Sequence, residues 1–310
     1  MKTVDIVVPM YNEEDVLPLY YTEIYKVIDS LPNYHFRLLF VDDGSSDGTL
    51  KMLKQIAKVN EDAGYVSFSR NFGKESAIYA GLKYATADII ILMDGDLEHP
   101  PELIPEMLDA LEEGYEACGA KRYAGFASNA FASINNKMSN VKLKKGATDY
   151  MCMSRRFVRS VLRLSETQRF SKGLFAWVGY NVKWIDYSQE DFKRPKGSSK
   201  WNFKKLFNYA SDGLTSFSTT PLRAISIVGF VVCIIAFIYI IVQLIVTLVT
   251  GIDVPGYTST LVIMLFLGGL ILLAIGILGE YIGKIYLESK DRPMYILGQT
   301  NLKKRDEDEY

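Results

Sequence analysis

The sequence predicts an α/β protein with a mostly parallel sheet, followed by two helices that cross a membrane. Two observations carry this prediction. Short apolar runs alternate with helical segments along the N-terminal two thirds of the 310-residue chain, at the spacing of strand–helix–strand units. Two long apolar segments without charged residues lie near the C-terminus, which indicates one large domain plus a membrane appendage.

The strands and helices are expected to alternate along the chain. We expect strands at residues 5–9, 35–41, 65–69, 89–93, 116–120, 149–153 and 181–186. We expect helices at residues 16–31, 47–60, 74–85 and 155–164, and another that begins at Pro100, because proline suits a first helical turn. The basic segment 121–146 fits either an amphipathic helix at a membrane surface or an ordinary surface helix.

Charge, cysteines and histidines narrow the classes of function. The net charge of -1 gives no sign of a nucleic-acid partner. Cys118, Cys152 and Cys233 show no paired spacing, which excludes a zinc-ligand set and gives no sign of a disulfide framework. His35 and His99 have no ligand partner nearby in the sequence, so we expect both to be structural. No G-x-G-x-x-G follows the first strand and no P-loop occurs, so neither nucleotide fingerprint is present.

Two uncharged segments predict a membrane hairpin. Residues 224–252 and 254–279 contain no Asp, Glu, Lys or Arg, and each exceeds the roughly 20 residues that a spanning helix needs. We expect transmembrane helices at about 222–250 and 257–283. Basic residues such as Arg223 and Lys284 flank the outer ends, whereas the connecting loop has none. The positive-inside rule then places the N-terminal domain and both termini in the cytoplasm, at the plasma membrane.

This organisation divides the chain into four parts. Residues 1–201 are expected to form a cytoplasmic α/β domain, 202–221 a juxtamembrane amphipathic segment, 222–288 the two spans, and 289–310 a cytoplasmic tail. We expect the charged end of that tail, residues 303–310, to be disordered.

Carboxylates follow the buried apolar strand at residues 89–93. Asp94, Asp96 and Glu98 alternate along the chain, so an extended backbone would bring them to one side. Oxygen ligands of this kind suit Mg²⁺ or Mn²⁺, which also bind substrate phosphates. The alternative is a solvated acidic turn in which Gly95 supplies the bend.

Further polar residues are expected at the same edge of the sheet. Asn12 and Glu13 follow the first strand, and Asp42 and Asp43 follow the second, where carboxylates can accept hydrogen bonds from a ribose or a base. Positive charge beside the membrane comes from Arg122, Arg194, Lys196 and Lys200. Taken alone, the first group also fits a capped turn, and the basic residues also fit juxtamembrane anchors. Together they favour transfer of a sugar from a nucleotide diphosphate to a membrane lipid.

The role of Asp149, at the start of the strand at 149–153, depends on the acceptor. A lipid phosphate with a second pKa of about 6 is largely dianionic at neutral pH and needs no base. Asp149 would then orient the acceptor or the sugar. A hydroxyl acceptor would need a true general base. We therefore count Asp94, Asp96 and Asp149 as the candidate catalytic residues.

Several motifs resemble the family 2 glycosyltransferases with a GT-A fold. They are VPMYNEE at 8–14, VDDGSSDGT at 41–49, NFGK at 71–74 and MDGDLEHPP at 93–101. With WVGY at 177–180, the basic segment at 194–200 and the two spans, the chain is similar to the polyprenyl-phosphate glycosyltransferases. That group includes bactoprenol glucosyltransferase and dolichol-phosphate mannose synthase.

The resemblance implies an inverting transferase that uses Mg²⁺ or Mn²⁺ at Asp94, Asp96 and Glu98. Its donor would be a nucleotide-diphosphate sugar, expected to be UDP-linked, and its acceptor a polyprenyl phosphate such as undecaprenyl phosphate on the cytoplasmic face. The product would be a donor for cell-envelope glycan modification. Similar two-span bacterial proteins are tetramers, so a homotetramer is implied. The expected nucleotide-binding residues are Pro9, Tyr11, Asn12, Glu13, Val41, Asp43, Gly73, Lys74, Asp94, Gly95, Arg194 and Lys200. The expected acceptor-phosphate residues are Arg122, Lys137 and Lys196.

The sequence departs from the family pattern at three places. Gln is common where Glu98 stands, Thr148 and Tyr150 replace the usual neighbours of Asp149, and Lys137 is the nearest equivalent of a second phosphate-binding arginine. Two rival functions stay open: a membrane transferase that makes a glycolipid on a hydroxyl acceptor, and a non-catalytic scaffold that binds a nucleotide-sugar. No residue identifies the sugar.

Overall fold

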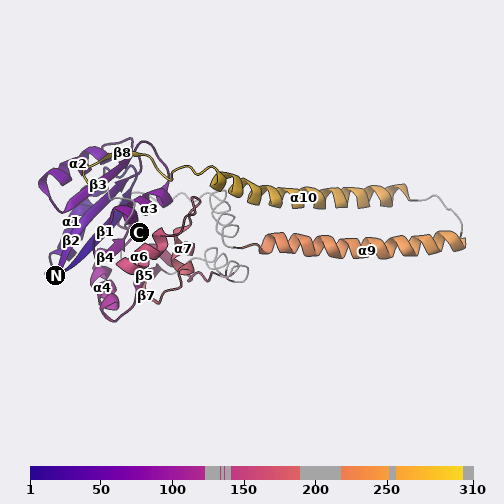
Figure 1. Cartoon of the computed structure of the whole chain (residues 1–310), viewed down its shortest axis with the longest axis horizontal. Coiled ribbons are helices and arrows are strands. Elements are labelled where there is room, and N and C mark those ends of the chain that lie inside the picture. The colour runs from indigo at the N-terminus through magenta and orange to yellow at the C-terminus, as the bar shows by residue number, and fades with distance from the viewer. Residues whose placement is uncertain (123–132, 134–135, 137–140, 189–217, 251–255, 303–310) are drawn as a thin grey trace.

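The computed structural model describes residues 1–122, 133, 136, 141–188, 218–250 and 256–302. An α/β domain forms one end, and two long helices project from it as an antiparallel pair (Figure 1). In chain order the elements are β1 (Lys2–Met10), α1 (Leu17–Ile28), β2 (Tyr34–Asp42), α2 (Thr49–Val59), β3 (Ala63–Phe68), α3 (Lys74–Tyr84), β4 (Ile89–Leu92), the 3₁₀ turn η1 (Pro101–Leu103), α4 (Ile104–Glu112), β5 (Ala117–Arg122), β6 (Ala147–Ser154), α6 (Arg155–Leu162), α7 (Ser171–Trp177), β7 (Val182–Tyr187), α9 (Thr220–Thr250), α10 (Tyr257–Ser289) and β8 (Leu297–Thr300).

The described strands form one mixed sheet in the order β7-β5-β6-β4-β1-β2-β3-β8. β1 pairs in parallel with both β2 and β4, and β3 continues the parallel run beyond β2. β6 is antiparallel to both of its neighbours, and β8 is antiparallel to β3. The chain order reverses between β1 and β4, which is where open α/β sheets bind their ligands.

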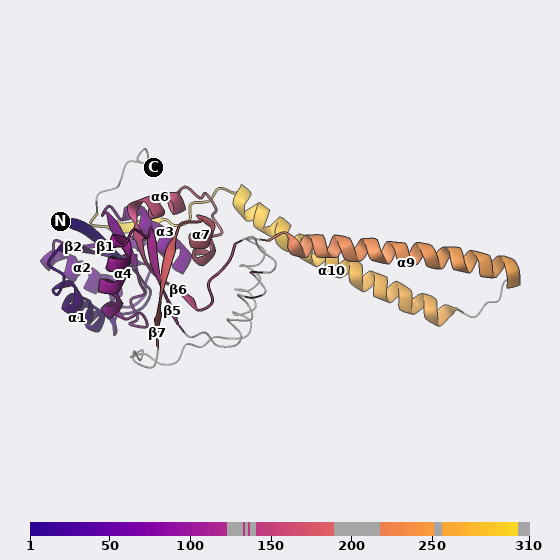
Figure 2. The same ribbon diagram turned by 90° about the horizontal axis from the view of Figure 1, so that it is seen from below.

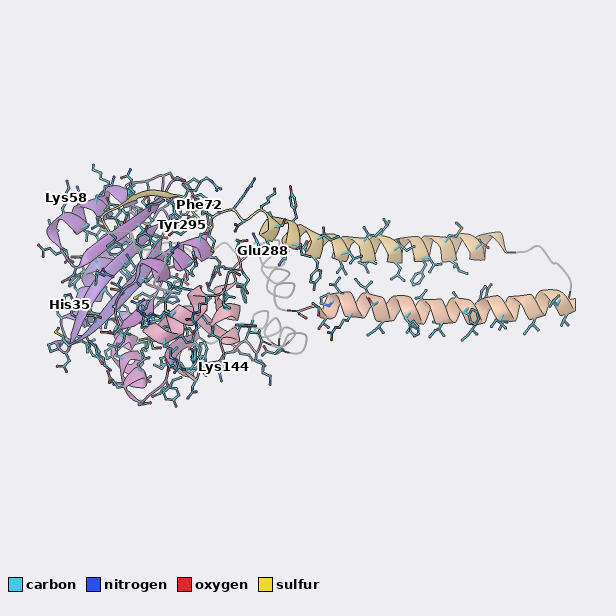
Figure 3. The ribbon with its side chains drawn as sticks, viewed as in Figure 1. His35, Lys58, Phe72, Lys144, Glu288 and Tyr295 are labelled. Carbon is cyan, nitrogen blue, oxygen red and sulfur yellow. The ribbon has the colours of Figure 1, made fainter. Side chains whose placement is uncertain are left out.

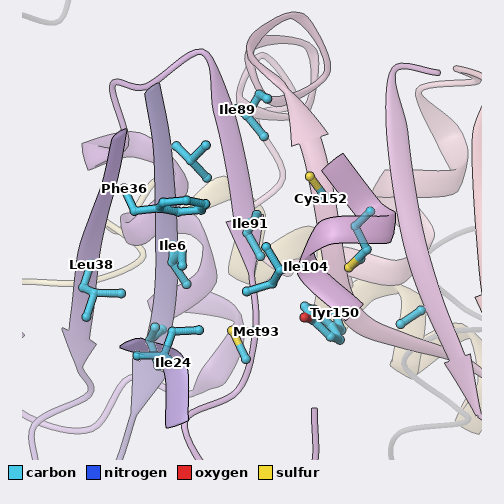
Figure 4. Close-up of a cluster of buried hydrophobic side chains, with 14 of the residues drawn as sticks. Ile6, Ile24, Phe36, Leu38, Ile89, Ile91, Met93, Ile104, Tyr150 and Cys152 are labelled. Atoms are coloured by element: carbon cyan, nitrogen blue, oxygen red, sulfur yellow. The ribbon is translucent and has the colours of Figure 1, made fainter. Parts of the chain in front are cut away.

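Both faces of the sheet are covered because successive side chains of a strand point to opposite sides. On β1, Val4, Ile6 and Val8 pack into one apolar cluster that includes residues of α1 and α4, whereas Val7 packs into another that includes residues of α3, α6 and α7. Figure 4 shows the first cluster, with Ile6 in its centre. Each fully buried aliphatic side chain of this kind contributes about 1.5–3 kcal/mol. Burial on both faces explains why β4 and residues 6–10 of β1 are apolar.

The two long helices leave their apolar side chains uncovered. α9 has 31 residues and α10 has 33, so at 1.5 Å per residue they are about 46 and 50 Å long, against a hydrocarbon layer of about 30 Å. Side chains such as Phe230, Phe266 and Leu272 are 65–71% exposed along the pair (Figure 3). Because soluble proteins rarely expose an apolar surface of this extent, α9 and α10 are candidate membrane spans.

The C-terminal end of the hairpin is attached to the α/β domain at two places. At the end of α10, the Glu288 carboxylate accepts the backbone N–H groups of Thr167 and Gln168, with distances of 2.9–3.1 Å. The chain then runs along the domain to β8, which pairs with β3 and forms the edge of the sheet (Figure 1 and Figure 2). The segments on both sides of the hairpin therefore belong to one folded body.

The structure confirms the predicted fold class, and the observed strands and helices include the predicted ones. β8 and α7 were not predicted. β8 is only four residues long and α7 only seven, too short for a clear periodic pattern. Residues 202–217 of the predicted juxtamembrane segment, the domain boundary at 201 and the charged end at 303–310 lie outside the described residues, as does most of the segment 123–140.

A buried ion pair supports the end of the sheet opposite the crevice. The Asp5 carboxylate, 1% exposed, accepts both the Nε and the Nη2 donors of Arg37 at 2.8 Å, and also the backbone N–H groups of Thr86 and Ala87. It thereby joins β1, β2 and the connection before β4.

We expect Asp5→Ala to lower the free energy of unfolding by about 3–5 kcal/mol, because it leaves buried donors and a partly buried guanidinium without their partner. Thermal unfolding of the purified protein in detergent measures this as a lower midpoint. Lys2→Ala is the matched control. It removes an exposed Lys2–Glu112 ion pair, for which we expect less than about 1 kcal/mol. Equal effects of the two changes would contradict this account of Asp5.

Candidate active site

A cavity lies at the carboxyl ends of β1, β2 and β4, where the chain order reverses. Its volume is about 290 Å³. The residues that line it come from the loops after these strands and from the start of α3: Pro9, Met10, Tyr11, Glu13, Asp43, Asn71, Gly73, Lys74, Ala77, Asp94, Gly95 and Asp96. Four of its side chains are carboxylates and one is an ammonium. The carboxylates can accept hydrogen bonds from ligand hydroxyl groups and can bind a cation that accompanies the ligand.

The turn after β2 is fixed by contacts of Asp43 and Gly44 with the loop after β3. The Asp43 carboxylate accepts the backbone N–H of Phe72 at 2.6 Å and that of Gly73 at 2.9 Å. Burial raises the pKa of Asp43, whereas these two donors lower it, and burial dominates. Gly44 has φ +66° and lies against the backbone of Arg70, so a side chain at this position would collide with that backbone. The turn therefore depends on the loop after β3, and Asp43 faces the cavity in a fixed position.

Lys74 joins two carboxylates that come from different strands. Its Nζ lies 2.8 Å from Oδ1 of Asp94, which follows β4, and 2.7 Å from Oδ2 of Asp149 on β6. Burial alone would lower the pKa of Lys74, but the two carboxylates outweigh it and raise that pKa well above its usual range. Lys74 is therefore a permanent cation at the centre of the site.

Asp149 is ionised for a related reason. Burial acts to raise its pKa, but the positive charges of Lys172 and Lys74 outweigh burial and hold that pKa well below the usual range of a carboxyl group. Asp149 thus has little tendency to take up a proton at neutral pH. This favours the orienting role over that of a general base.

Behind Asp94 lies a buried histidine. The backbone N–H of Asp94 donates to Nδ1 of His99 at 3.1 Å, so His99 acts as an acceptor and is neutral. Its ring stacks on Tyr150 with the centroids 5.1 Å apart, and the Tyr150 hydroxyl donates to the carbonyl oxygen of Pro100. His99 is structural, as predicted, and it holds the backbone that presents Asp94.

The acidic segment after β4 has the donor atoms that a divalent cation needs. Burial and the adjacent Asp94 raise the pKa of Asp96, so a cation placed between these carboxylates would relieve their repulsion. Glu98 lies 3.5 Å from Nη1 of Arg122. Among the described residues, no three His, Cys, Asp or Glu side chains are already gathered around one point, and the Lys74 ammonium lies against Asp94 instead.

A second cavity of about 370 Å³ lies beyond β6, next to Asp149. Thr148 lines it, whereas Lys74, the partner of Asp149, lines the first cavity. Its walls are basic and aromatic, and among them are Lys142, Lys144, Lys172, Phe175, Tyr180 and Trp184. Asp149 lines neither cavity, but of the two lysines whose charges act on it, Lys74 lines the first and Lys172 the second.

The structure brings together most of the predicted site residues. Pro9, Tyr11, Glu13, Asp43, Gly73, Lys74, Asp94, Gly95 and Asp96 all line the first cavity. The amide oxygen of Asn12 accepts the N–H of Ser46 at 2.8 Å and so supports the turn after β2, and the Val41 side chain lies in the core. Asp42 accepts Ser67 Oγ at 2.7 Å, which makes it a structural partner. Lys137, Arg194, Lys196 and Lys200 lie outside the described residues.

Sequence reasoning missed Met10, Asn71, Ala77 and Lys172 as residues of the two cavities. Asn71 belongs to the NFGK motif, whose presence at 71–74 was a usable signal. Lys172 lies on α7, a helix that the sequence pattern did not predict, so nothing in the sequence placed its charge near Asp149.

The fold and this lysine-bridged acidic crevice define a transferase of the GT-A type attached to an apolar helical hairpin. Residues 5–166 match the model of Glycosyl transferase family 2, and the chain belongs to this family. The family predicted from the motifs is therefore confirmed, as is the prediction of a transferase.

Close relatives span nearly the whole chain. CsbB of Bacillus subtilis (strain 168), which is named as a glycosyltransferase, is 40% identical over 310 residues and the match covers 98% of this chain and 93% of that protein. Bactoprenol glucosyl transferase of Shigella phage SfV is 39% identical and the match covers 95% and 97%. The mannosyl-3-phosphoglycerate synthase structure from Rubrobacter xylanophilus matches 68% of this chain and 71% of that one, with 18% identity and a TM-score of 0.49.

Because His99 is buried, we expect the folded protein to lose stability at low pH. Burial lowers its pKa below the usual value of about 6.5, although Asp94 acts in the opposite direction. The unfolded chain then binds a proton before the folded one does. Stability is therefore lost as the pH falls from about 6.5 toward the lowered pKa of the folded state.

We expect the thermal midpoint of the wild-type protein to fall between pH 7.5 and 5.5, and the His99→Gln variant to lose less over the same range. His35→Gln is the control, because His35 is 54% exposed at its side chain and lies away from the crevice. A His99→Gln variant with the pH dependence of the wild type would rule out this role for His99.

Proposed function

We propose that this protein transfers a sugar from a nucleotide-diphosphate sugar to a polyprenyl phosphate at a membrane surface. The crevice is the observation that supports this best: Asp43, Asp94, Asp96 and Lys74 surround one cavity at the switch point of the sheet. Two candidate spans and relatives named bactoprenol glucosyl transferase support a lipid phosphate as acceptor. The donor is expected to be UDP-linked.

The reaction inverts the anomeric centre. An oxygen of the lipid phosphate attacks the anomeric carbon from the face opposite the diphosphate. The bond from that carbon to the diphosphate oxygen breaks, and its electron pair leaves with the nucleoside diphosphate. The acceptor is largely dianionic at neutral pH, because its second pKa is about 6, so no proton has to be removed.

Asp94 and Asp96 are the residues that would hold Mg²⁺ or Mn²⁺, and the bound ion would neutralise charge on the leaving diphosphate. Glu98 is the third candidate ligand. Asp43 is positioned to accept hydrogen bonds from the ribose or the base.

Lys74 and Asp149 have complementary tasks. The Lys74 ammonium contacts Asp94 and faces the cavity, so it can bind a phosphate oxygen of the donor. Asp149 stays ionised and orients the sugar or the acceptor between the two cavities. We assign the acceptor phosphate to the basic, aromatic second cavity and to Arg122, because their positive charge suits a phosphate.

The transfer is tested with purified protein, labelled UDP-sugars, undecaprenyl phosphate and either Mg²⁺ or Mn²⁺. We expect a labelled polyprenyl-monophosphate sugar that disappears when EDTA removes the metal. Product that forms only with diacylglycerol would show a glycolipid synthase instead. Nucleotide-sugar binding without any product would show a scaffold.

We expect Asp96→Asn to lower turnover by more than about 100-fold, since it removes a carboxylate that would hold the divalent cation on the leaving diphosphate, while the thermal midpoint stays within a few degrees. Glu98→Gln, which introduces the residue common in the family, is expected to stay within about tenfold of the wild type. Turnover and unfolding are measured on the same preparations. If Glu98→Gln loses as much activity as Asp96→Asn, Glu98 is a necessary ligand and its assigned role must change.

The two-span topology predicts which sites react with a membrane-impermeant maleimide. We place Asp29→Cys in the α/β domain, Gln299→Cys on β8 and Gly256→Cys at the start of α10, each exposed, in a chain whose three native cysteines are replaced. We expect the first two to react only in inverted membranes and the third only in intact cells. Labelling of Gln299→Cys from the outside would contradict a hairpin with both termini in the cytoplasm.

A further inference from the structure

The chain beyond the second long helix completes the outer edge of the sheet. α10 ends at Ser289, and β8 begins at Leu297. The backbone N–H of Ser69, just after β3, donates to the carbonyl oxygen of Ile296 at 3.0 Å. The paired residues of the two strands are Val66 with Thr300, Ser67 with Gln299 and Phe68 with Leu297. A segment of chain that follows the hairpin thus holds the strand that leads into the crevice.

Aromatic rings continue this contact toward the crevice. The ring of Tyr295, just before β8, stacks on Phe68 with the centroids 4.7 Å apart and an angle of 20° between the rings, and meets Tyr79 of α3 edge-on. Phe68 contacts Phe72 edge-on at 5.9 Å, and the Arg70 guanidinium lies 4.0 Å from the centroid of the Phe72 ring. Figure 3 shows Tyr295 and Phe72 on the side of the domain that faces the base of α10.

The loop at residues 69–73, here called the donor loop, is part of the first cavity. Its Asn71 and Gly73 line that cavity, and its Phe72 and Gly73 N–H groups hold the Asp43 carboxylate at 2.6 and 2.9 Å. α3 begins at the next residue, Lys74, whose ammonium joins Asp94 to Asp149. The position of the donor loop therefore determines where both Asp43 and Lys74 stand.

We propose that Tyr295 is a positioning residue for the nucleotide end of the donor, acting through Phe68 and the donor loop. Tyr295 does not line the cavity, so it is not a catalytic residue. Its ring covers the aromatic side chain at the end of β3 and limits the conformations of the loop that follows. The inference rests on the proposed function only for the identity of the ligand, a nucleoside diphosphate. The contact between Tyr295 and the donor loop does not depend on it.

Two properties of the fold make the donor loop depend on this contact. Without β8, β3 would be an edge strand with open hydrogen-bonding groups, and the donor loop would follow a frayed end. A loop that must be ordered on ligand binding lowers affinity, whereas a loop held in place beforehand does not. Tyr295 and β8 provide that order through residues that sit just beyond the end of α10.

The test compares Tyr295→Ala, Tyr295→Phe and Gln299→Ala in the full-length protein in detergent. Gln299→Ala is the matched control, since it changes an exposed side chain on the same strand and leaves the β3–β8 backbone pairing in place. Hydrogen exchange of a peptide that covers residues 70–75 reports the protection of the Phe72 and Gly73 amides without any ligand. Titration with UDP and Mn²⁺ reports affinity.

We expect Tyr295→Ala to speed exchange of this peptide about tenfold or more and to weaken UDP binding by a similar factor, with β1 and β4 exchanging as in the wild type. Tyr295→Phe keeps the stacked ring and should restore both, and Gln299→Ala should change neither. Unchanged exchange in Tyr295→Ala, or a Tyr295→Phe variant as impaired as Tyr295→Ala, would overturn the proposal. A wild-type protein that binds no UDP would count against the proposed function, and the exchange result would still decide the role of Tyr295.

Discussion

A single ammonium group, that of Lys74, decides the geometry of the crevice. Asp94 arrives at the end of a parallel strand, whereas Asp149 sits on the antiparallel strand beside it, and two such carboxylates in a partly buried site repel each other. Lys74 lies within 2.8 Å of both. Because it is the first residue of α3, its position is fixed by a helix that packs on β1 and β2. The loop after β4 and strand β6 therefore share one cationic centre, and neither can move independently of the other.

The sequence was most informative where one strand or loop acts alone. The apolar runs of β1 and β4 are buried on both faces, so their composition revealed them, and the polar residues directly after each strand had to fall at one edge of the sheet. Contacts between residues that lie far apart in the sequence could not be predicted from it. Nothing near Asp149 in the sequence indicates Lys172, and nothing near Asp5 indicates the amides of Thr86 and Ala87. The contacts of Asn12 and Asp42 could not be foreseen either: Asn12 accepts the N–H of Ser46, and Asp42 accepts the N–H of Ser45 and the hydroxyl of Ser67. Local pattern therefore indicates at which edge of the sheet polar residues gather, whereas tertiary contacts decide which of their side chains face the cavity.

The hairpin and the α/β domain are joined more closely than a tether would require. Tyr281 donates from α10 to the carbonyl oxygen of Ser218 at 2.6 Å, just before α9, so the two helices meet where they leave the domain. Glu288 then caps the backbone ahead of α7, and α7 lines the basic cavity. The orientation of the crevice relative to the hairpin is thus set by specific hydrogen bonds rather than by the length of a linker, which is what a soluble donor and a membrane-bound acceptor require if they are to meet at one point.

The late place of β8 in the chain also has a consequence for biosynthesis. Thr300 and Tyr65 are hydrogen-bonded although 235 positions separate them. The ribosome therefore synthesises both candidate membrane spans before it synthesises the strand that covers β3. Until β8 emerges from the ribosome, β3 presents an open edge, where it can pair with another chain. A message truncated between the codons for α10 and those for β8 would produce a protein that contains both long helices but in which β3 remains an open edge. Such a chain is a natural substrate for quality-control proteases.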